Sequence, residues 1–296
     1  MNRRTFLKVG AAAGATSLTG CASAPRKPGQ VDEDFAVLVD LTMCAGCRMC
    51  ESACAEANGL PEPVLEEDVD EKTRDTSETR WQVVNRFATT KGDVYVRRQC
   101  MHCVEPACAA ACLTKAMLKT DEGPVIWRED KCMGCRYCMV SCPFDGPKFE
   151  YNSANPRIQK CRMCFERVSE GGQPACVENC PAGALTFGKR GELLELARRR
   201  IYEQPDQFVS HIYGEHEAGG TGWLYISPVP FEELGFPAGI RQGSYPELTR
   251  DFLTSVPVVL TLWPAFLLAL RRSTSTDEGD EPAGHAADDR PSEVVS

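Results

Sequence analysis

Sixteen of the 17 cysteines in this chain of 296 residues fall into four groups of four. The groups are Cys44, Cys47, Cys50, Cys54; Cys100, Cys103, Cys108, Cys112; Cys132, Cys135, Cys138, Cys142; and Cys161, Cys164, Cys176, Cys180. The first and third groups read C-x2-C-x2-C-x3-C, and the other two open with C-x2-C and close with C-x3-C. In this spacing three thiolates hold one 4Fe–4S cluster and the fourth reaches a neighbouring cluster. The sequence therefore predicts four 4Fe–4S clusters, with all sixteen grouped cysteines as iron ligands.

The residues inside and after the groups suit that chemistry. Gly46 and Gly134 stand where a tight loop needs backbone angles that other residues avoid. The fourth cysteine follows the third by one helical turn, so it can face a different cluster. Pro143 and Pro181 follow the third and fourth groups, as in bacterial ferredoxins. The first two groups lack this proline, which we interpret as a weaker turn signal and not as a lost ligand.

Other uses of so many cysteines fit the pattern less well. A zinc ribbon needs only four ligands in two C-x2-C pairs, and a disulfide scaffold does not favour cysteines this close in sequence. Catalytic thiol chemistry needs a histidine partner, and His102, one of 4 histidines, lies inside a cysteine group and is not expected to be a ligand. No nucleophile–base pair or nucleotide loop stands out, so no catalytic residue is predicted. The net charge of -9 disfavours nucleic-acid binding.

The groups alternate between two kinds, which indicates an internal repeat. The first and third share C-x-G-C-R-x-C-x3-C, with Arg48 and Arg136 in matching places, and the second and fourth share P-A-C-x3-C. Two copies of a two-group unit are the simplest account. Short apolar runs at residues 37–39, 94–96, 117–118 and 185–187 predict small strands. The predicted fold is α+β, a tandem bacterial-ferredoxin-like domain at residues 29–190 that is held largely by its cofactors.

Basic residues accompany the cysteine groups. They are Arg48, Arg97, Arg98, Arg136, Lys160, Arg162 and Arg167. A 4Fe–4S cluster with four thiolates is a buried anion, and buried charge needs opposite charge or hydrogen bonds. Cations close to the sulfurs can therefore raise cluster potentials. The alternative for any one of them is an ordinary surface residue.

Residues 1–28 form a predicted export signal that is set apart from the fold. Arg3 and Arg4, followed by Thr-Phe-Leu-Lys, resemble the twin-arginine signal, which directs export of folded proteins. Cys21 stands outside the four groups and follows Leu-Thr-Gly, as in a lipobox. Cys21 is therefore a candidate for lipidation, with an ordinary signal-peptidase site beside it as the alternative.

Residues 251–271 are predicted to form one transmembrane helix. Residues 252–270 carry no charge over about the length that spans a bilayer, and Arg271 and Arg272 follow, as expected on the cytoplasmic side. A buried core helix is the alternative. The acidic tail at 272–296 is predicted to be disordered.

Two long segments of the chain contain no cysteine. Residues 191–250 are predicted to be an extension that runs along the cysteine domain to the membrane. Residues 56–99 are predicted to be an exposed insertion, which meets either partner subunits or solvent.

Residues 35–190 resemble the ferredoxin-like electron-transfer subunits of membrane-bound respiratory oxidoreductases. These include the beta subunits of dimethyl sulfoxide reductase, polysulfide reductase, nitrite-reduction and formate dehydrogenase systems. The resemblance, carried by the four cysteine groups, implies that the first group pairs with the fourth and the second with the third. The implied ligand sets are Cys44, Cys47, Cys50 and Cys180 (set A); Cys54, Cys161, Cys164 and Cys176 (set B); Cys100, Cys103, Cys108 and Cys142 (set C); and Cys112, Cys132, Cys135 and Cys138 (set D).

Residues 99–103, 134–140 and 213–221, with an export signal and an anchor on one chain, resemble HybA-type subunits of membrane-bound nickel–iron hydrogenases. This resemblance implies a non-catalytic electron-transfer subunit on the periplasmic side of the bacterial inner membrane, anchored in the lipid bilayer. Its implied partners are a nickel–iron hydrogenase catalytic subunit and a multi-span, quinone-reactive membrane subunit. Formate dehydrogenase beta subunits share the anchor and a Gly-Gly-Thr stretch. The alternative catalytic partner is therefore a molybdopterin oxidoreductase of the formate dehydrogenase or dimethyl sulfoxide/polysulfide reductase type.

Overall fold

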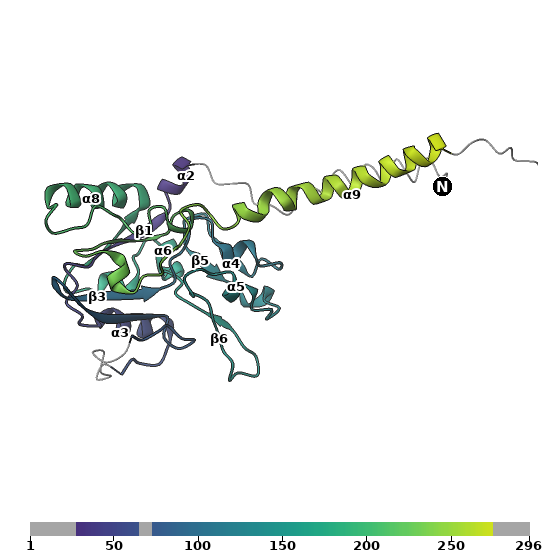
Figure 1. Cartoon of the computed structure of the whole chain (residues 1–296). Coiled ribbons are helices and arrows are strands. Elements are labelled where there is room, and N and C mark those ends of the chain that lie inside the picture. The colour runs from purple at the N-terminus through teal and green to yellow at the C-terminus, as the bar shows by residue number, and fades with distance from the viewer. Residues whose placement is uncertain (1–27, 65–72, 275–296) are drawn as a thin grey trace, which may run out of the picture. The chain divides into compact units, whose positions relative to one another are not determined.

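The computed structural model describes residues 28–64 and 73–274 (Figure 1). The predicted twin-arginine signal, the lipidation candidate Cys21 and residues 275–296 of the predicted tail lie outside the described residues. The chain divides into two compact units: the large unit ends at Arg250, and Asp251 and the residues after it belong to the other. The large unit combines short helices with strands that pair mostly antiparallel, which confirms the α+β class.

A three-stranded sheet joins distant parts of the large unit. Its strands are β1 (Phe35–Asp40), β8 (Leu185–Lys189) and β9 (Trp223–Ile226), in the order β8-β1-β9. β1 pairs antiparallel with β8 and parallel with β9. Residues 191–250 therefore supply a strand to the same sheet as the cysteine domain.

The other elements of the large unit are short. The helices are α2 (Pro28–Asp32), α3 (Met49–Asn58), α4 (Ala107–Ala110), α5 (Tyr137–Val140), α6 (Phe165–Ser169), α7 (Ala175–Glu178) and α8 (Arg190–Glu203), with 3-10 turns η1 (Glu129–Lys131), η2 (Glu217–Gly219) and η3 (Phe231–Leu234). Hairpins pair β2 (Gln82–Thr89) with β3 (Gly92–Gln99), β4 (Met117–Lys119) with β5 (Val125–Trp127), and β6 (Lys148–Phe149) with β7 (Ile158–Gln159). The strands predicted from the four apolar runs are confirmed as β1, β3, β4 and β8.

Side chains of β1 alternate between two buried faces, because successive residues of a strand point to opposite sides. Ala36 and Leu38 pack in an apolar cluster with residues of α8, which lies along that face (Figure 1). Val37 and Val39 pack in a second apolar cluster with Trp223 of β9. A strand buried on both faces reads as a continuous apolar run, which explains why its sequence predicted a strand so clearly.

The two copies of the repeat share backbone conformation in their cysteine loops. Arg48 and Arg136 both adopt the left-handed region, with φ of 60° and 59°, and each immediately precedes a helix, α3 or α5. Pro106 and Pro174 likewise precede α4 and α7. The internal repeat is therefore present in three dimensions as matching loop–helix elements.

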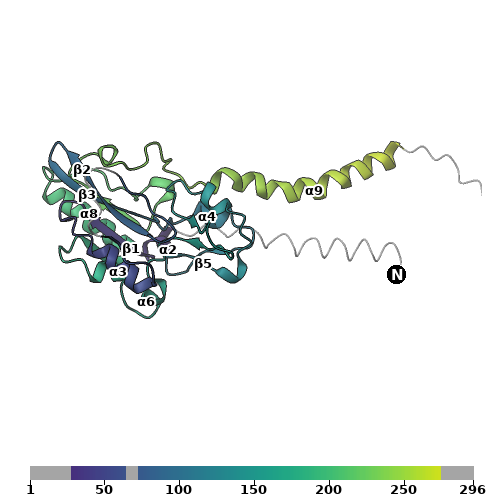
Figure 2. The ribbon, with the colours of Figure 1, turned by 90° about the horizontal axis from the view of Figure 1, so that it is seen from below.

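The large unit has two regions that differ in construction. We call residues 105–160 the hairpin half, which contains α4, α5 and the hairpins β4–β5 and β6–β7, and the rest of the described large unit the core half. Figures 1 and 2 show α4 and β5 at one end of the large unit, and α3 and α8 at the other. Arg250, its last residue, forms an ion pair with Glu105 over 3.1 Å. The chain therefore leaves the large unit beside the hairpin half.

The helix α9 (Glu247–Thr274) contains the predicted membrane segment. Among the described residues it is the one helix long and apolar enough to cross a membrane, judged by length and composition. None of its residues is buried, and Pro257 and Pro264 lie inside it. A C-terminal apolar helix is thus confirmed, and its exposure does not favour the alternative of a buried core helix.

Candidate iron–sulfur sites

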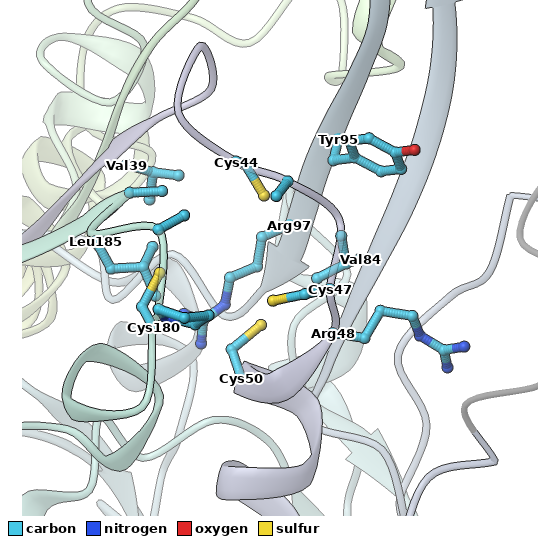
Figure 3. Close-up of a pocket in the computed structure, with 14 residues that line it drawn as sticks. Val39, Cys44, Cys47, Arg48, Cys50, Val84, Tyr95, Arg97, Cys180 and Leu185 are labelled. Atoms are coloured by element: carbon cyan, nitrogen blue, oxygen red, sulfur yellow. The ribbon is translucent and has the colours of Figure 1, made fainter.

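Cys44, Cys47, Cys50 and Cys180 of set A line one cavity, although Cys180 comes from another cysteine group (Figure 3). The space among the lining side chains, counted together with open solvent at its mouth, is about 470 Å³. Three of the cysteines lie on the loop and first turn that join β1 to α3, and the fourth lies just before β8. In Figure 3 their side chains surround a common space, into which Arg97 extends from β3. The fold therefore brings all four thiols of set A together.

The thiols of the other three sets are neighbours as well. In set B, the pKa of Cys54 is raised first by burial and then by the other three cysteines of the set. In set C, burial raises the pKa of Cys103, and the other three cysteines of that set raise it further. In set D, burial and the other three thiols raise the pKa of Cys138 to about 11. Each set joins cysteines from two groups.

The chemistry of these donor sets fits iron–sulfur clusters. Burial is the main cause that raises the pKa of Cys50 and of Cys161 to about 12, so a free thiolate is unfavourable at either place. A coordinating metal deprotonates a thiol outright. No three Cys, His, Asp or Glu side chains of the described residues converge tightly enough for a single metal ion. Among the sets, set A lines a described cavity, which leaves room there for a group larger than one ion.

Contacts between sets place them in a row. Cys50 of set A is close enough to Cys176 of set B for that thiolate to raise its pKa. Cys161 of set B packs with Cys100 of set C. Cys108 of set C packs in one apolar cluster with the buried cysteine of set D. The order of neighbours is A, B, C, D.

The ends of this row are more open to solvent than its middle. Cys47 of set A and Cys135 of set D are exposed, whereas set B is entirely buried and set C has no exposed cysteine. Exposed large apolar residues adjoin both open ends in sequence: Met43 and Met49 at set A, and Leu113, Met133, Tyr137 and Val140 at set D. Exposed apolar patches of this kind mark surfaces that contact other proteins or membranes.

Five of the seven predicted basic residues are engaged with groups other than cysteines. Three form surface ion pairs: Arg98 with Asp75, Arg162 with Glu166, and Arg167 with Glu178. Arg136 lies over the ring of Phe149, 5.3 Å from the centroid. Arg48 is bound to the Glu51 carboxylate. The interpretation as ordinary surface residues therefore holds for Arg98, Arg162 and Arg167, whereas the ion pair of Arg48 is buried.

The other two basic residues, Arg97 and Lys160, are buried beside cysteines. Lys160 Nζ donates hydrogen bonds to the backbone carbonyls of Val125 and Cys161. Arg97 Nη2 donates to Sγ of Cys176 over 3.2 Å. These two residues have the burial that compensation of a buried anion requires.

Sequence reasoning missed two groups that support the sites. Glu51 is buried in α3 and accepts hydrogen bonds from Arg48, Arg74 and the backbone N–H of Val84, which ties the insertion to the first cysteine loop. An acidic residue inside a cysteine-rich helix start, three positions after an arginine, was the available signal. The second group is β9, whose apolar, aromatic sequence is itself typical of a buried strand.

His102 is fully buried. Its Nδ1 accepts a hydrogen bond from the N–H of Val125 over 2.9 Å, and burial is the main cause that holds the pKa of the imidazole well below its usual value. His102 therefore supports the loop as a neutral side chain, with Nδ1 occupied by the protein backbone.

Two family models match the chain. Residues 1–20 match the twin-arginine translocation pathway signal sequence, and residues 93–190 match the 4Fe-4S dicluster domain. The second match contains three of the four cysteine groups. The matches confirm the predicted export signal and 4Fe–4S chemistry, while the number of four clusters stays a prediction.

Similar proteins cover most of the chain. A protein of Nitratidesulfovibrio vulgaris is 44% identical over 290 residues, which are 94% of this chain and 78% of that protein. The hydrogenase-2 operon protein HybA of Escherichia coli O157:H7 is 33% identical over 330 residues, with 96% of this chain and 99% of that protein covered. The nitrate-inducible formate dehydrogenase iron-sulfur subunit of Escherichia coli K12 is 35% identical over 219 residues, with 71% and 74% covered.

Proposed function

Because the chain belongs to the HybA-type family of iron–sulfur subunits, within the broader group that includes formate dehydrogenase iron–sulfur subunits, we propose that sets A to D each hold one 4Fe–4S cluster. The chain is an electron-transfer subunit of a respiratory oxidoreductase, exported by the twin-arginine route to the periplasmic side of the membrane. When bound, each cluster supplies a site that takes up or gives off one electron. The protein itself orders these sites and controls their access to water.

The observation that carries this proposal is the row A, B, C, D with open ends. The two middle sets have no exposed cysteine, so the protein excludes water where only transfer within the chain is needed. The two outer sets each present one exposed cysteine and adjacent apolar residues, so a partner subunit can approach there. The formate dehydrogenase relative is itself named an iron–sulfur subunit, which supports an electron-transfer role for this chain. We therefore propose that the chain is not an enzyme on its own.

The exposed apolar residues at set D support contact with a quinone-reactive membrane subunit. Glu105, in the hairpin half, binds Arg250 and Ser244, so the last residues of the large unit lie against the hairpin half. We assign the exposed apolar surface at set D, in the same half, to the membrane subunit. The set A surface, with Met43 and Met49, is then the contact for the catalytic subunit. Methionines are frequent in such interfaces.

We propose a nickel–iron hydrogenase as the catalytic partner. The HybA relative, named for a hydrogenase operon, aligns over 96% of this chain, whereas the formate dehydrogenase subunit aligns over 71%. Full-length similarity includes the regions outside the cysteine groups, which are the parts free to differ between partners. A molybdopterin oxidoreductase is the alternative.

The test is purification of the complex through this chain in mild detergent, followed by metal analysis and hydrogen-dependent dye reduction. We expect nickel, hydrogen oxidation by the complex, and roughly sixteen iron atoms in the chain once it is separated, at four per cluster. Molybdenum without nickel would replace hydrogenase by the alternative partner. Iron near half the expected value, or hydrogen turnover by the isolated chain, would overturn the four-cluster, non-catalytic assignment.

A further inference from the structure

Arg97 is a buried cation between two ligand sets. Only 3% of the residue is exposed. Its side chain lines the cavity of set A (Figure 3), and its Nη2 donates to Sγ of Cys176 in set B over 3.2 Å. The guanidinium group of Arg97 therefore lies between set A and set B, inside the core half.

No carboxylate of the described residues lies within ion-pair distance of Arg97, and its Nε and Nη1 have no hydrogen-bond partner in the part of the chain that the structure describes. A buried charge in this situation is strongly unfavourable unless an anion compensates for it. The groups nearby that carry negative charge once they ligate a cluster are cysteine thiols. Burial lowers the pKa of Arg97, but Cys176, Cys50 and Cys161 raise it, and the net direction is upward. These cysteines belong to sets A and B alone.

Strand β9, in the segment of residues 191–250, holds the Arg97 guanidinium in place. Trp223 of β9 stacks on it, with the guanidinium carbon 4.2 Å from the ring centroid. The Tyr225 hydroxyl donates to the Arg97 carbonyl over 3.2 Å and accepts from Gln99 Nε2 over 2.6 Å. The strand next to β1 thus fixes both the backbone and the side chain of Arg97.

We propose that Arg97 is a shared positive charge that raises the reduction potentials of the two clusters held by sets A and B. The inference rests on the proposed ligand sets. Reduction adds one electron, and so one negative charge, to a cluster without breaking a bond, and the electron comes from the neighbouring redox partner. A fixed cation stabilises the reduced form more than the oxidised form. Because Arg97 is buried, salt screens this effect only weakly.

The geometry limits the effect to one end of the row. Lys160, the other buried basic residue, donates to two backbone carbonyls. Burial raises the pKa of the set C thiols Cys108 and Cys142, and the positive charge of Lys160 opposes that rise. Arg97 therefore acts on sets A and B, and Lys160 lies with set C. Arg97 therefore places a fixed positive charge beside these two sets and is not an iron ligand.

The test compares Arg97→Gln, Arg97→Lys and the matched control Arg98→Gln in the full-length loaded protein. Arg98 is the next residue, and it pairs with Asp75 at the surface. Redox titration followed by electron paramagnetic resonance measures the midpoint potential of each cluster. For Arg97→Gln we expect two of the four midpoint potentials to fall by ~59 mV each. For a one-electron step, this lowers the ratio of reduced to oxidised cluster about tenfold at a fixed potential.

Arg97→Lys keeps the charge but not the fork that spans both sets, so we expect a smaller fall, about threefold in the ratio at one or both of the same clusters. Arg98→Gln should change none. A fully loaded Arg97→Gln protein with unchanged potentials, or with all four shifted alike, would refute the inference while the cluster assignment stands. If Arg97→Gln does not load its clusters, the uncharged variant Arg97→Met decides, and unchanged potentials in a loaded Arg97→Met protein refute the inference as well, whereas Arg97→Lys keeps the positive charge. Fewer than four clusters in the wild type would instead refute the ligand sets.

Discussion

The first and third cysteine groups repeat one motif in different surroundings, the first in the core half and the third in the hairpin half. In the core half, the first group stands beside a three-stranded sheet buried on both faces, with α8 on one side. In the hairpin half, the third group stands between strands of two or three residues, with Tyr137 and Val140 exposed. The comparison shows that cysteine spacing sets the local loop and helix, while the residues between the groups decide burial.

The matched arginines of the repeat show the difference at one position. Arg48 and Arg136 have the same backbone conformation. Arg48 is 5% exposed and is bound to Glu51 in the core half, whereas Arg136 lies over the rings of Phe149 and Tyr151 in the hairpin half. The same residue therefore braces an insertion in one copy and covers a small hairpin in the other.

The largest expected contrast is between a ligand in the middle of the row and one at its open end. Cys176 of set B is buried in the apolar core and touches Arg97, whereas Cys135 of set D is exposed. We expect Cys176→Ser to abolish accumulation of loaded, folded protein, because metal binding and folding are coupled there. Cys135→Ser should give folded protein that lacks roughly four of about sixteen irons.

Iron per chain and circular dichroism of both variants, expressed side by side, measure this contrast. Serine at either position changes one sulfur to oxygen, so the two substitutions are chemically matched. Equal iron loss with equal folding in the two variants would show that the core half does not depend on its clusters more than the hairpin half.

A smaller contrast compares two carboxylates. Glu51 is buried between Arg48 and Arg74, with Oε atoms 3.1 and 2.8 Å from their guanidinium nitrogens. Glu129 pairs with Arg157 in the hairpin half, and both of these side chains are about half exposed. Removing one charge from a buried network costs about 3–5 kcal/mol, and breaking an exposed pair costs about 1 kcal/mol or less. Thermal unfolding of Glu51→Gln and Glu129→Gln should show this order.

The pH dependence of the Glu51 effect follows from its pKa. Burial raises that pKa, but hydrogen bonds from Arg74, Arg48 and the N–H of Val84 outweigh burial, so the folded pKa lies below the usual value. The stabilisation is therefore complete above the unfolded pKa of about 4.3 and is lost as pH falls through the folded pKa. The gap between wild type and Glu51→Gln should be equal at pH 6 and pH 8. A gap that shrinks across that interval would contradict this account.

The paired glycines of the repeat give a third comparison. Gly46 and Gly134 both have positive φ, 66° and 72°. A Cβ at Gly46 would lie 2.4 Å from ring atoms of Tyr95, whereas one at Gly134 would meet nothing within 4 Å. Gly134→Ala should cost only the backbone strain, about 1–2 kcal/mol, and Gly46→Ala should cost about 1–3 kcal/mol more through overpacking. Unfolding midpoints of the two loaded variants check the difference, and equal values would contradict the packing argument.

Local features were predictable from sequence, and long-range ones were not. The loops around Gly46 and Gly134, the helices that follow them and the strands that flank them depend on residues within a few positions. The parallel pairing of Val37 with Trp223 and the contact of Arg97 with Cys176 join residues far apart in the chain. Spacing alone allows each fourth cysteine to reach a different cluster, but does not say which one. The assignment of each fourth cysteine to a cluster rests on the family resemblance, and the four ligand sets stay a prediction.

The smallest expected effect tests whether the repeat extends beyond the cysteines. Lys115 and Gly183 occupy matching places three residues after the last cysteine of the even groups, and both have positive φ, 56° and 62°. The left-handed region costs a non-glycine residue about 1–2 kcal/mol, and Lys115 is exposed, so little packing is lost by its removal. Glycine, however, gains entropy in the unfolded chain. We expect Lys115→Gly to raise the free energy of unfolding by about 0.5–1 kcal/mol. Lys115→Ala is the matched control, since it removes the same side chain but keeps the strain, and it should leave stability unchanged. If the alanine variant stabilises as much as the glycine variant, the lysine side chain and not the shared backbone conformation carries the cost, and the repeat ends with the cysteines.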